Sequence, residues 1–150
     1  MELRAKKFTA DAILPEFQTT GAAGADMCAN ETIVAQPGQA TLVKLGIGFD
    51  IPEGHFMMLC LRSSTPRKKG LFIPNGVGII DSDYKGEFML MVAPLGNEPV
   101  TIEKGERIAQ TVLVPCKNLF TSGIEVTKII EVEELEASER GEGGFGSTGK

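Results

Sequence analysis

Residues Asn75–Met91 read NGVGIIDSDYKGEFMLM, and this stretch decides the fold class. Two apolar arms flank the polar loop DSDYKG, a pattern typical of two antiparallel strands joined by a turn. The simplest register places Gly78 opposite Met89. Because a glycine inside a strand often marks close approach by a ligand or another backbone, we expect a flat ring to fit between the arms. From this segment alone, Asp81 and Asp83 read equally well as ordinary loop acids.

The same alternation of short apolar runs and turn signals continues on both sides of this stretch. It predicts an all-β chain built as a sandwich, jelly roll or barrel. The expected strands are Thr41–Phe49, His55–Leu61, Glu87–Val92, Arg107–Val114 and Ile124–Val132. The expected turns are Gln36–Gly38, Pro52–Gly54, Gly96–Pro99 and Glu103–Gly105.

One short helix is expected after Arg62. Ser63 to Thr65 offer capping hydroxyls, Pro66 suits the first helical position, and three basic residues favour the C-terminal end. Gly70 then ends the helix after about one turn. The free N–H groups and hydroxyls of its N-terminal end predict a contact with an anion.

Composition narrows the function classes. The 150 residues are 42% hydrophobic, which fits one globular domain. No apolar run approaches the ~20 residues of a membrane helix, and no secretory signal is visible at the N-terminus. Three widely spaced cysteines indicate reduced, buried thiols and a cytoplasmic location. The net charge of −5 argues against nucleic acid as a partner, and a single histidine, His55, argues against a zinc site.

The last residues, RGEGGFGSTGK (Arg140–Lys150), contain the spacing of a phosphate loop. The strand-turn-helix context of such loops is missing, because Lys150 is the last residue. Two interpretations stay open. A glycine-rich terminus is usually a disordered tail, whereas successive backbone N–H groups can also curl around an anion.

Five motifs in this order make the chain similar to the trimeric dUTP diphosphatases (dUTPases). The motifs span nearly the whole sequence: AGADMCA (Ala23–Ala29), RSS (Arg62–Ser64), NGVGIIDSDYKGE (Asn75–Glu87), GERIAQ (Gly105–Gln110) and RGEGGFGSTG (Arg140–Gly149). The resemblance implies a jelly-roll-like fold and hydrolysis of dUTP to dUMP and pyrophosphate. It also implies a homotrimer whose sites are shared between subunits. A β catalytic domain would span residues 1–135, and a closing arm would span residues 136–150.

The resemblance assigns roles residue by residue. Asp81 resembles the carboxylate that activates the attacking water, and Tyr84 resembles the ring that excludes a 2′-hydroxyl. Asp26 resembles the acid that holds Mg²⁺ through water. The uracil contacts correspond to Asn75, Gly78, Ile79, Ile80 and Met89. The phosphate contacts correspond to Arg62, Ser63, Ser64 and Gln110. The closing arm corresponds to Arg140, Phe145, Gly146 and Ser147.

Two departures and two rivals qualify this interpretation. Leu61 precedes RSS where smaller residues or proline are common, and Lys85 stands where arginine is frequent; neither removes a group that the chemistry needs. One rival is a dCTP deaminase or bifunctional relative, which release of ammonia from dCTP would reveal. The other is a catalytically silent β-module or capsid-like jelly roll, which would bind dUTP without releasing pyrophosphate. A viral source would place the enzyme in the host-cell cytoplasm.

Overall fold

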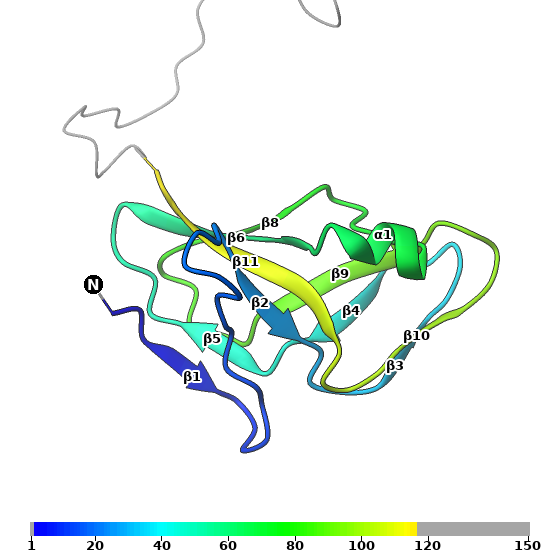
Figure 1. Cartoon of the computed structure of the whole chain (residues 1–150), viewed down its shortest axis with the longest axis horizontal. Coiled ribbons are helices and arrows are strands. Elements are labelled where there is room, and N and C mark those ends of the chain that lie inside the picture. The colour runs from blue at the N-terminus through cyan, green and yellow to red at the C-terminus, as the bar shows by residue number, and fades with distance from the viewer. Residues whose placement is uncertain (1, 117–150) are drawn as a thin grey trace, which may run out of the picture.

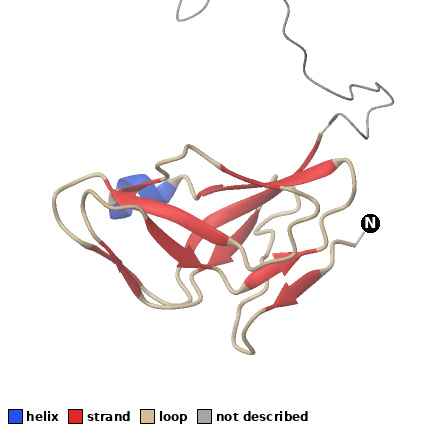
Figure 2. Ribbon diagram, turned by 180° about the vertical axis from the view of Figure 1, so that it is seen from behind, coloured by secondary structure: helices blue, strands red, loops and turns tan. Residues whose placement is uncertain are grey.

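The structure is a computed structural model that describes residues 2–116. The described chain forms strands and one short helix, as the sequence predicts (Figures 1 and 2). The strands are β1 (Ala5–Lys7), β2 (Ala25–Cys28), β3 (Ile33–Ala35), β4 (Thr41–Lys44), β5 (Ile47–Phe49), β6 (His55–Leu61), β7 (Leu71–Phe72), β8 (Gly78–Ile80), β9 (Met89–Pro94), β10 (Val100–Ile102) and β11 (Arg107–Pro115). The helix is α1 (Ser64–Lys69).

The strands pair into two larger sheets and two small ribbons. The four-stranded sheet has the order β2-β11-β6-β8, and the three-stranded sheet has the order β4-β9-β7. The ribbons are β1-β5 and β10-β3. Every described pair is antiparallel, and most partners are far apart in sequence. This arrangement is a jelly-roll-like, all-β fold.

The core lies between the larger sheets. Alternate residues of a strand point to opposite faces, so each sheet contributes one apolar face. From the four-stranded sheet come Met57, Leu59 and Ile108, and from the facing sheet come Leu90 and Val92. All five are almost fully buried. Loss of a large side chain here would cost about 2–5 kcal/mol of unfolding free energy.

The expected strand Thr41–Phe49 is interrupted at Gly46. Its φ of +71° is left-handed, and an added Cβ would lie 2.7 Å from the Asn30 side chain. The break ends β4 in one sheet and starts β5 in another, so a continuous strand was the wrong prediction. The bounds of β6 match the prediction, and three of the expected turns close with backbone hydrogen bonds: Gln36–Gln39, Pro52–His55 and Glu103–Glu106.

The helix is confirmed, with one change at its start. Gly70 is left-handed at its C-terminal end, and its N–H donates to the Pro66 carbonyl. The helix begins at Ser64, so Pro66 is its third residue rather than its first. Ser63 stands at the cap position without a capping side-chain hydrogen bond. Instead, the buried Thr65 hydroxyl donates to the Ile108 carbonyl at 3.2 Å, which attaches α1 to β11.

The thiols are less buried than expected. Of the three thiols only that of Cys28 is buried, whereas Cys60 and Cys116 are half-buried. Among the residues that the structure describes, no helix is long and apolar enough to cross a membrane.

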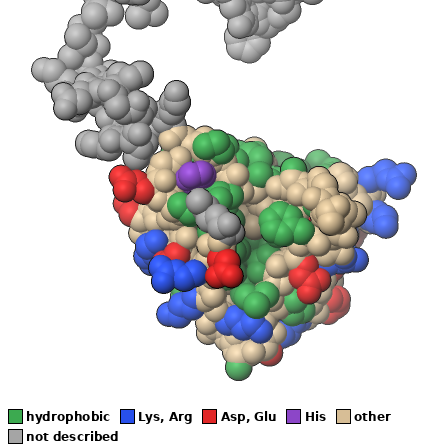
Figure 3. Space-filling view, turned by 60° about the vertical axis from the view of Figure 1, so that its left-hand side comes forward, with side chains coloured by type: hydrophobic (Ala, Val, Ile, Leu, Met, Phe, Trp, Pro, Cys, Tyr) green, Lys and Arg blue, Asp and Glu red, His purple; other side chains and the backbone are tan. Residues whose placement is uncertain are grey.

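Hydrophobic side chains gather in a hollow on the face drawn in Figure 3, with charged side chains at its margins. An apolar groove runs between β1, β5 and β11, and none of the predicted site residues lines it. Its main lining residues are Leu3, Leu14, Phe17, Phe49, Met57 and Leu113.

Candidate active site

The two arms of the quoted stretch become β8 and β9, and they do not pair with each other. β8 pairs with β6, with Gly78 opposite Leu59, and β9 pairs with β4, with Met89 opposite Lys44. The expected pairing of Gly78 with Met89 is therefore wrong. The close backbone neighbour of Gly78 is β6: an added Cβ would lie 3.2 Å from the Leu59 Cβ.

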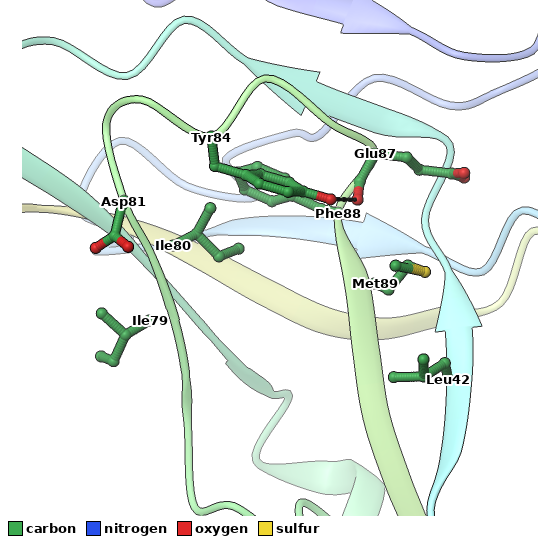
Figure 4. Close-up of a pocket in the computed structure, with 8 residues that line it drawn as sticks. All are labelled: Leu42, Ile79, Ile80, Asp81, Tyr84, Glu87, Phe88 and Met89. Carbon is green, nitrogen blue, oxygen red and sulfur yellow. Dashed lines mark hydrogen bonds between the residues drawn. The ribbon is translucent and has the colours of Figure 1, made fainter.

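This divergence opens a pocket of about 270 Å³ between the two arms. β8 is an edge strand, and β9 pairs with β7 only at its far end, through Ala93 and Pro94. Over the pocket, both facing strand edges therefore retain N–H and C=O groups outside any described ladder. Figure 4 shows Ile80 pointing into the gap from β8, with Leu42 and Met89 on the opposite side. A flat ring with polar edges fits such a slot.

Tyr84 and Phe88 form one end of this pocket. The ring centroids are 6.4 Å apart, and the Tyr84 hydroxyl donates to the Glu87 carbonyl at 3.0 Å (Figure 4). Gly86 lies directly beneath the Tyr84 ring, because an added Cβ would lie only 2.6 Å from the Tyr84 Cζ. The absence of a side chain at Gly86 therefore allows the ring to lie where it does.

Asp81 stands at the rim, where β8 ends. It lines the pocket and is exposed to solvent. The Tyr84 N–H donates to the Asp81 carbonyl at 3.2 Å, so the turn spans Asp81 to Tyr84 and centres one residue earlier than the hairpin pattern suggests. The Lys85 ammonium donates to the Ser82 carbonyl at 3.0 Å and pairs with the Asp50 carboxylate at 3.5 Å. An exposed carboxylate at the rim of a slot can accept a proton from a water there.

A second pocket collects the residues that resemble phosphate and metal contacts. Its volume is about 300 Å³, and the predicted site residues that line it are all polar or charged. Five predicted residues line it: Asp26, Arg62, Ser63, Ser64 and Gln110. Gln110 of β11 lies directly opposite Asp26 of β2, which explains why motifs far apart in sequence meet here.

Asp26 lies between two guanidinium groups. Its Oδ1 accepts a hydrogen bond from Arg62 Nε at 3.0 Å, and its Oδ2 lies 3.6 Å from Arg107 NH1. Although the side chain is only 9% exposed, Oδ2 has no hydrogen-bond partner among the described residues. Burial raises the pKa of the neighbouring Cys28 thiol, so this thiol stays protonated and adds no charge.

The donor set around Asp26 fits a magnesium ion held through water. A buried acceptor without a partner is costly, and a metal-bound water is a donor that would satisfy it. Mg²⁺ keeps much of its hydration and is usually held by one or two carboxylates together with substrate phosphates. The free donors of Arg62, whose Nε alone contacts Asp26, remain available for such phosphates.

Asp26 of β2 and Asp81, which directly follows β8, lie at opposite edges of one sheet. β2 and β8 are separated by β11 and β6, so three strand spacings put them about 14 Å apart. Asp81 therefore does not reach the pocket of Asp26 within one chain. Asn75 is exposed and lines neither pocket. Gly78 has no side chain, so only its backbone lies beside the first pocket.

Sequence patterns missed several lining residues. Leu42 and Phe88 are ordinary apolar strand residues, and only their places in β4 and next to Tyr84 bring them to the first pocket. Glu87 lines the first pocket, and Arg107 contacts Asp26 without lining either pocket; both belong to quoted motifs that assign them no role. Glu87 accepts a hydrogen bond from the Gly46 N–H at 2.8 Å, which ties the quoted loop to the break between β4 and β5. Gln18 gave no signal at all.

Some predictions fall outside the described residues. They concern the strand Ile124–Val132, the boundary between residues 135 and 136, and the arm contacts of Arg140, Phe145, Gly146 and Ser147.

Comparison with known proteins identifies a single family. A family model described as dUTPase matches residues 10–149. The deoxyuridine 5′-triphosphate nucleotidohydrolase of Hydrogenobaculum sp. (strain Y04AAS1) is 41% identical over 150 residues, covering 99% of each chain. The enzyme of the same name from Nautilia profundicola is also 41% identical, covering 100% of each.

Solved structures give the same result. The dUTPase of Staphylococcus bacteriophage 80alpha, solved with dUpNHpp, matches with a TM-score of 0.82 at 31% identity over 99% of both chains. The dUTPase of Streptococcus mutans matches with a TM-score of 0.72 at 32% identity, covering 76% of this chain and 96% of that one.

Proposed function

This chain belongs to the dUTPase family and is a nucleotide hydrolase that acts on dUTP, and we propose that Asp81 is the general base of its reaction. The Asp81 carboxylate takes a proton from a water molecule, and the water oxygen forms a bond to the α-phosphorus. The bond between that phosphorus and the bridging oxygen breaks, and its electron pair leaves with pyrophosphate. The products are dUMP and pyrophosphate.

The observation that carries this proposal is the open slot between β8 and β9 with Asp81 at its rim. Uracil is flat and presents alternating donors and acceptors at its edge, which suits the unpaired main-chain groups of Gly78–Ile80 and Met89. Asn75, which is exposed and outside the pocket lining, would add its side-chain amide to this edge once uracil is bound. The Tyr84 ring lies against the deoxyribose and leaves no space for a 2′-hydroxyl. The phage 80alpha enzyme, solved with dUpNHpp, supports a deoxyuridine nucleotide as the occupant.

The pocket of Asp26 receives the phosphates. Arg62 offers a planar fork of donors, and Ser63, Ser64 and Gln110 offer neutral ones. Asp26 would hold Mg²⁺ through water, with Oδ2 as the acceptor. When bound, the ion neutralises phosphate charge and keeps the triphosphate in one conformation. An acidic chain can bind a polyanion in this way, because the positive field is local.

A complete site requires two pockets from different chains. The first pocket of one subunit faces the second pocket of a neighbour, and three such contacts close a homotrimer. The separation of about 14 Å between β2 and β8 supports this arrangement, because within a single chain Asp81 and Asp26 stay apart.

Residues 136–150 form an arm in which Phe145 stacks on uracil and Arg140 meets the distal phosphate, with Gly146 and Ser147 as further phosphate contacts. Residues 1–135 form the catalytic domain, and the unbridged thiols of Cys28 and Cys60 support a cytoplasmic location.

The test is a nucleotide panel. Purified protein with Mg²⁺ is mixed in turn with dUTP, dTTP, dCTP and UTP, and pyrophosphate and ammonia are measured. We expect pyrophosphate from dUTP, with kcat/KM at least about 100-fold below this for the other nucleotides, because unmatched buried polar groups and steric clashes oppose them. Comparable values for dUTP and dTTP, or ammonia from dCTP, would contradict the proposal.

A further inference from the structure

Arg107 has no role in the function described so far, yet it contacts two residues of the phosphate pocket. Its NH1 donates to Gln18 Oε1 at 2.8 Å and lies 3.6 Å from Asp26 Oδ2. We propose that Arg107 is a positioning residue that, together with Gln18, holds the Asp26 carboxylate in the orientation that accepts Mg²⁺-bound water. This inference rests on the proposed role of Asp26.

A single contact does not fix the Asp26 carboxylate. Rotation of an aspartate carboxylate about its last torsion is soft, with broad, roughly two-fold preferences. Arg62 Nε holds Oδ1 at 3.0 Å, which leaves the plane of the group free to turn about this contact. A second cation beside Oδ2 removes this freedom, and Arg107 supplies it from β11.

Gln18 sets the spacing between Arg107 and Asp26. The NH1 hydrogen bond goes to Gln18, while the distance of 3.6 Å to Oδ2 is too long for a hydrogen bond. Arg107 therefore attracts Oδ2 without occupying its lone pairs, and the oxygen keeps its capacity to accept from water. Without Gln18, the guanidinium would be free to close onto Oδ2 and compete with that water.

The anchor of Gln18 is Asp26 itself. Glu16 and Asp26 form a β-bridge, with Asp26 N–H donating to the Glu16 carbonyl at 2.9 Å and Glu16 N–H donating back at 3.3 Å. The Gln18 amide donates to the same Glu16 carbonyl at 3.4 Å. The contacts thus form a closed circuit from the Asp26 backbone through Gln18 and Arg107 to the Asp26 carboxylate.

The sign of a charge effect separates positioning from simple proximity. A nearby guanidinium repels a divalent cation, so removal of a mere neighbouring charge would tighten Mg²⁺ binding. If Arg107 instead positions Asp26, its removal weakens Mg²⁺ binding. The two explanations predict opposite shifts of the same quantity.

The experiment measures binding rather than turnover. Isothermal titration of each variant, saturated with dUpNHpp, gives the Mg²⁺ concentration at half-saturation. For Arg107→Gln we expect this concentration to rise about tenfold, the lower end of the effect of residues that orient metal-binding groups. Gln18→Ala should raise it less, and the two changes together should be less than additive, because they break one circuit. Arg107→Lys, which keeps the charge but not the fork, should lie between wild type and Arg107→Gln.

Arg4→Gln is the matched control. Arg4 forms an exposed ion pair with Asp50 at 2.9 Å, so it repeats an arginine–aspartate pair away from the phosphate pocket. Its Mg²⁺ half-saturation should equal that of wild type.

The outcomes that would contradict the inference are distinct. An unchanged or lower Mg²⁺ half-saturation in Arg107→Gln overturns the inference, as does a lower melting temperature with unchanged Mg²⁺ binding, which would mean a purely structural role. Asp26→Asn is measured in parallel. If it leaves Mg²⁺ binding unchanged, the proposed metal contact itself is wrong; if it weakens binding while Arg107→Gln does not, only the role of Arg107 is wrong.

Discussion

Asp81 and Asp83 are two residues apart in the same loop, and their sequence context does not separate them. The structure separates them by place. Asp81 lies where β8 ends and lines the slot, whereas Asp83 is an exposed turn residue that lines none of the described pockets named above. The local sequence pattern identified the loop as chemically important. Which of its two acids faces the slot depends on the residue at which β8 ends, and the pattern does not show that residue.

Replacing Asp81 with Asn should abolish most hydrolysis and preserve dUTP binding. The amide has nearly the same shape but cannot accept the proton, and general-base assistance is typically worth ~10²–10⁴-fold in rate. Steady-state kinetics and titration with dUpNHpp measure the two effects. Asp83→Asn is the control, with near-normal kcat expected. A kcat above about half of the wild-type value in Asp81→Asn would mean that another group is the base.

Gly86 should control selectivity against ribonucleotides. In Gly86→Ala the new methyl group would meet the Tyr84 ring, 2.6 Å from Cζ, and would displace it from the pocket. We expect the ratio of kcat/KM for dUTP over UTP to fall at least about tenfold. Gly96→Ala is the control, since its Cβ would meet nothing within 4 Å. An unchanged ratio in Gly86→Ala would show that Tyr84 does not read the sugar.

At the scale of elements, patterns predicted strands and turns better than their partners. β6, β11 and α1 follow from alternation, caps and breakers, because these signals are local. The pairing of β8 with β6 rather than β9 was missed, since apolar alternation says which face of a strand is buried but not which neighbour lies at each edge. The same limit explains why β4 and β5 were merged: the turn at Gly46 depends on contact with Asn30.

Thr65 should couple the helix to both stability and substrate affinity. In Thr65→Val the buried Ile108 carbonyl loses its donor, which costs about 1–3 kcal/mol. Each kcal/mol should lower the melting temperature by about 2–4 °C, and KM should rise because α1 carries Ser64. Thr101→Val, on an exposed face of β10, should leave both values unchanged. A variant Thr65→Val that melts with wild type would show that the hydroxyl contributes nothing.

At the scale of the whole molecule, the predicted site residues fall into two groups rather than one. The sequence motifs identified which residue types take part, because a carboxylate, an arginine or a pair of serines can be recognised within a short motif. They could not show that Asp81 and Asp26 lie at opposite edges of the same sheet, since that follows from the strand order β2-β11-β6-β8. Under the proposed function, this order is what calls for a second copy of the chain.

Mixing two inactive variants should therefore restore activity. Asp81→Asn spoils the first pocket and Arg62→Gln spoils the second, but neighbours in a mixed trimer can pair one intact pocket of each kind. Random assembly of equal amounts should give about a quarter of the wild-type sites. Light scattering should give three times the chain mass of 16.0 kDa. Activity that stays absent after subunit exchange, or an active monomer, would contradict shared sites.

The strand order also sets when this protein can fold during synthesis. β11, which is the last described strand, lies between β2 and β6, so the four-stranded sheet has no centre until residues 107–115 have left the ribosome. β3 likewise waits for β10. Such distant pairings close large loops and make folding slow, in the range of milliseconds to seconds. β2 and β3 must therefore remain without their ladder partners through most of translation, when ribosome-associated chaperones would have the most to bind.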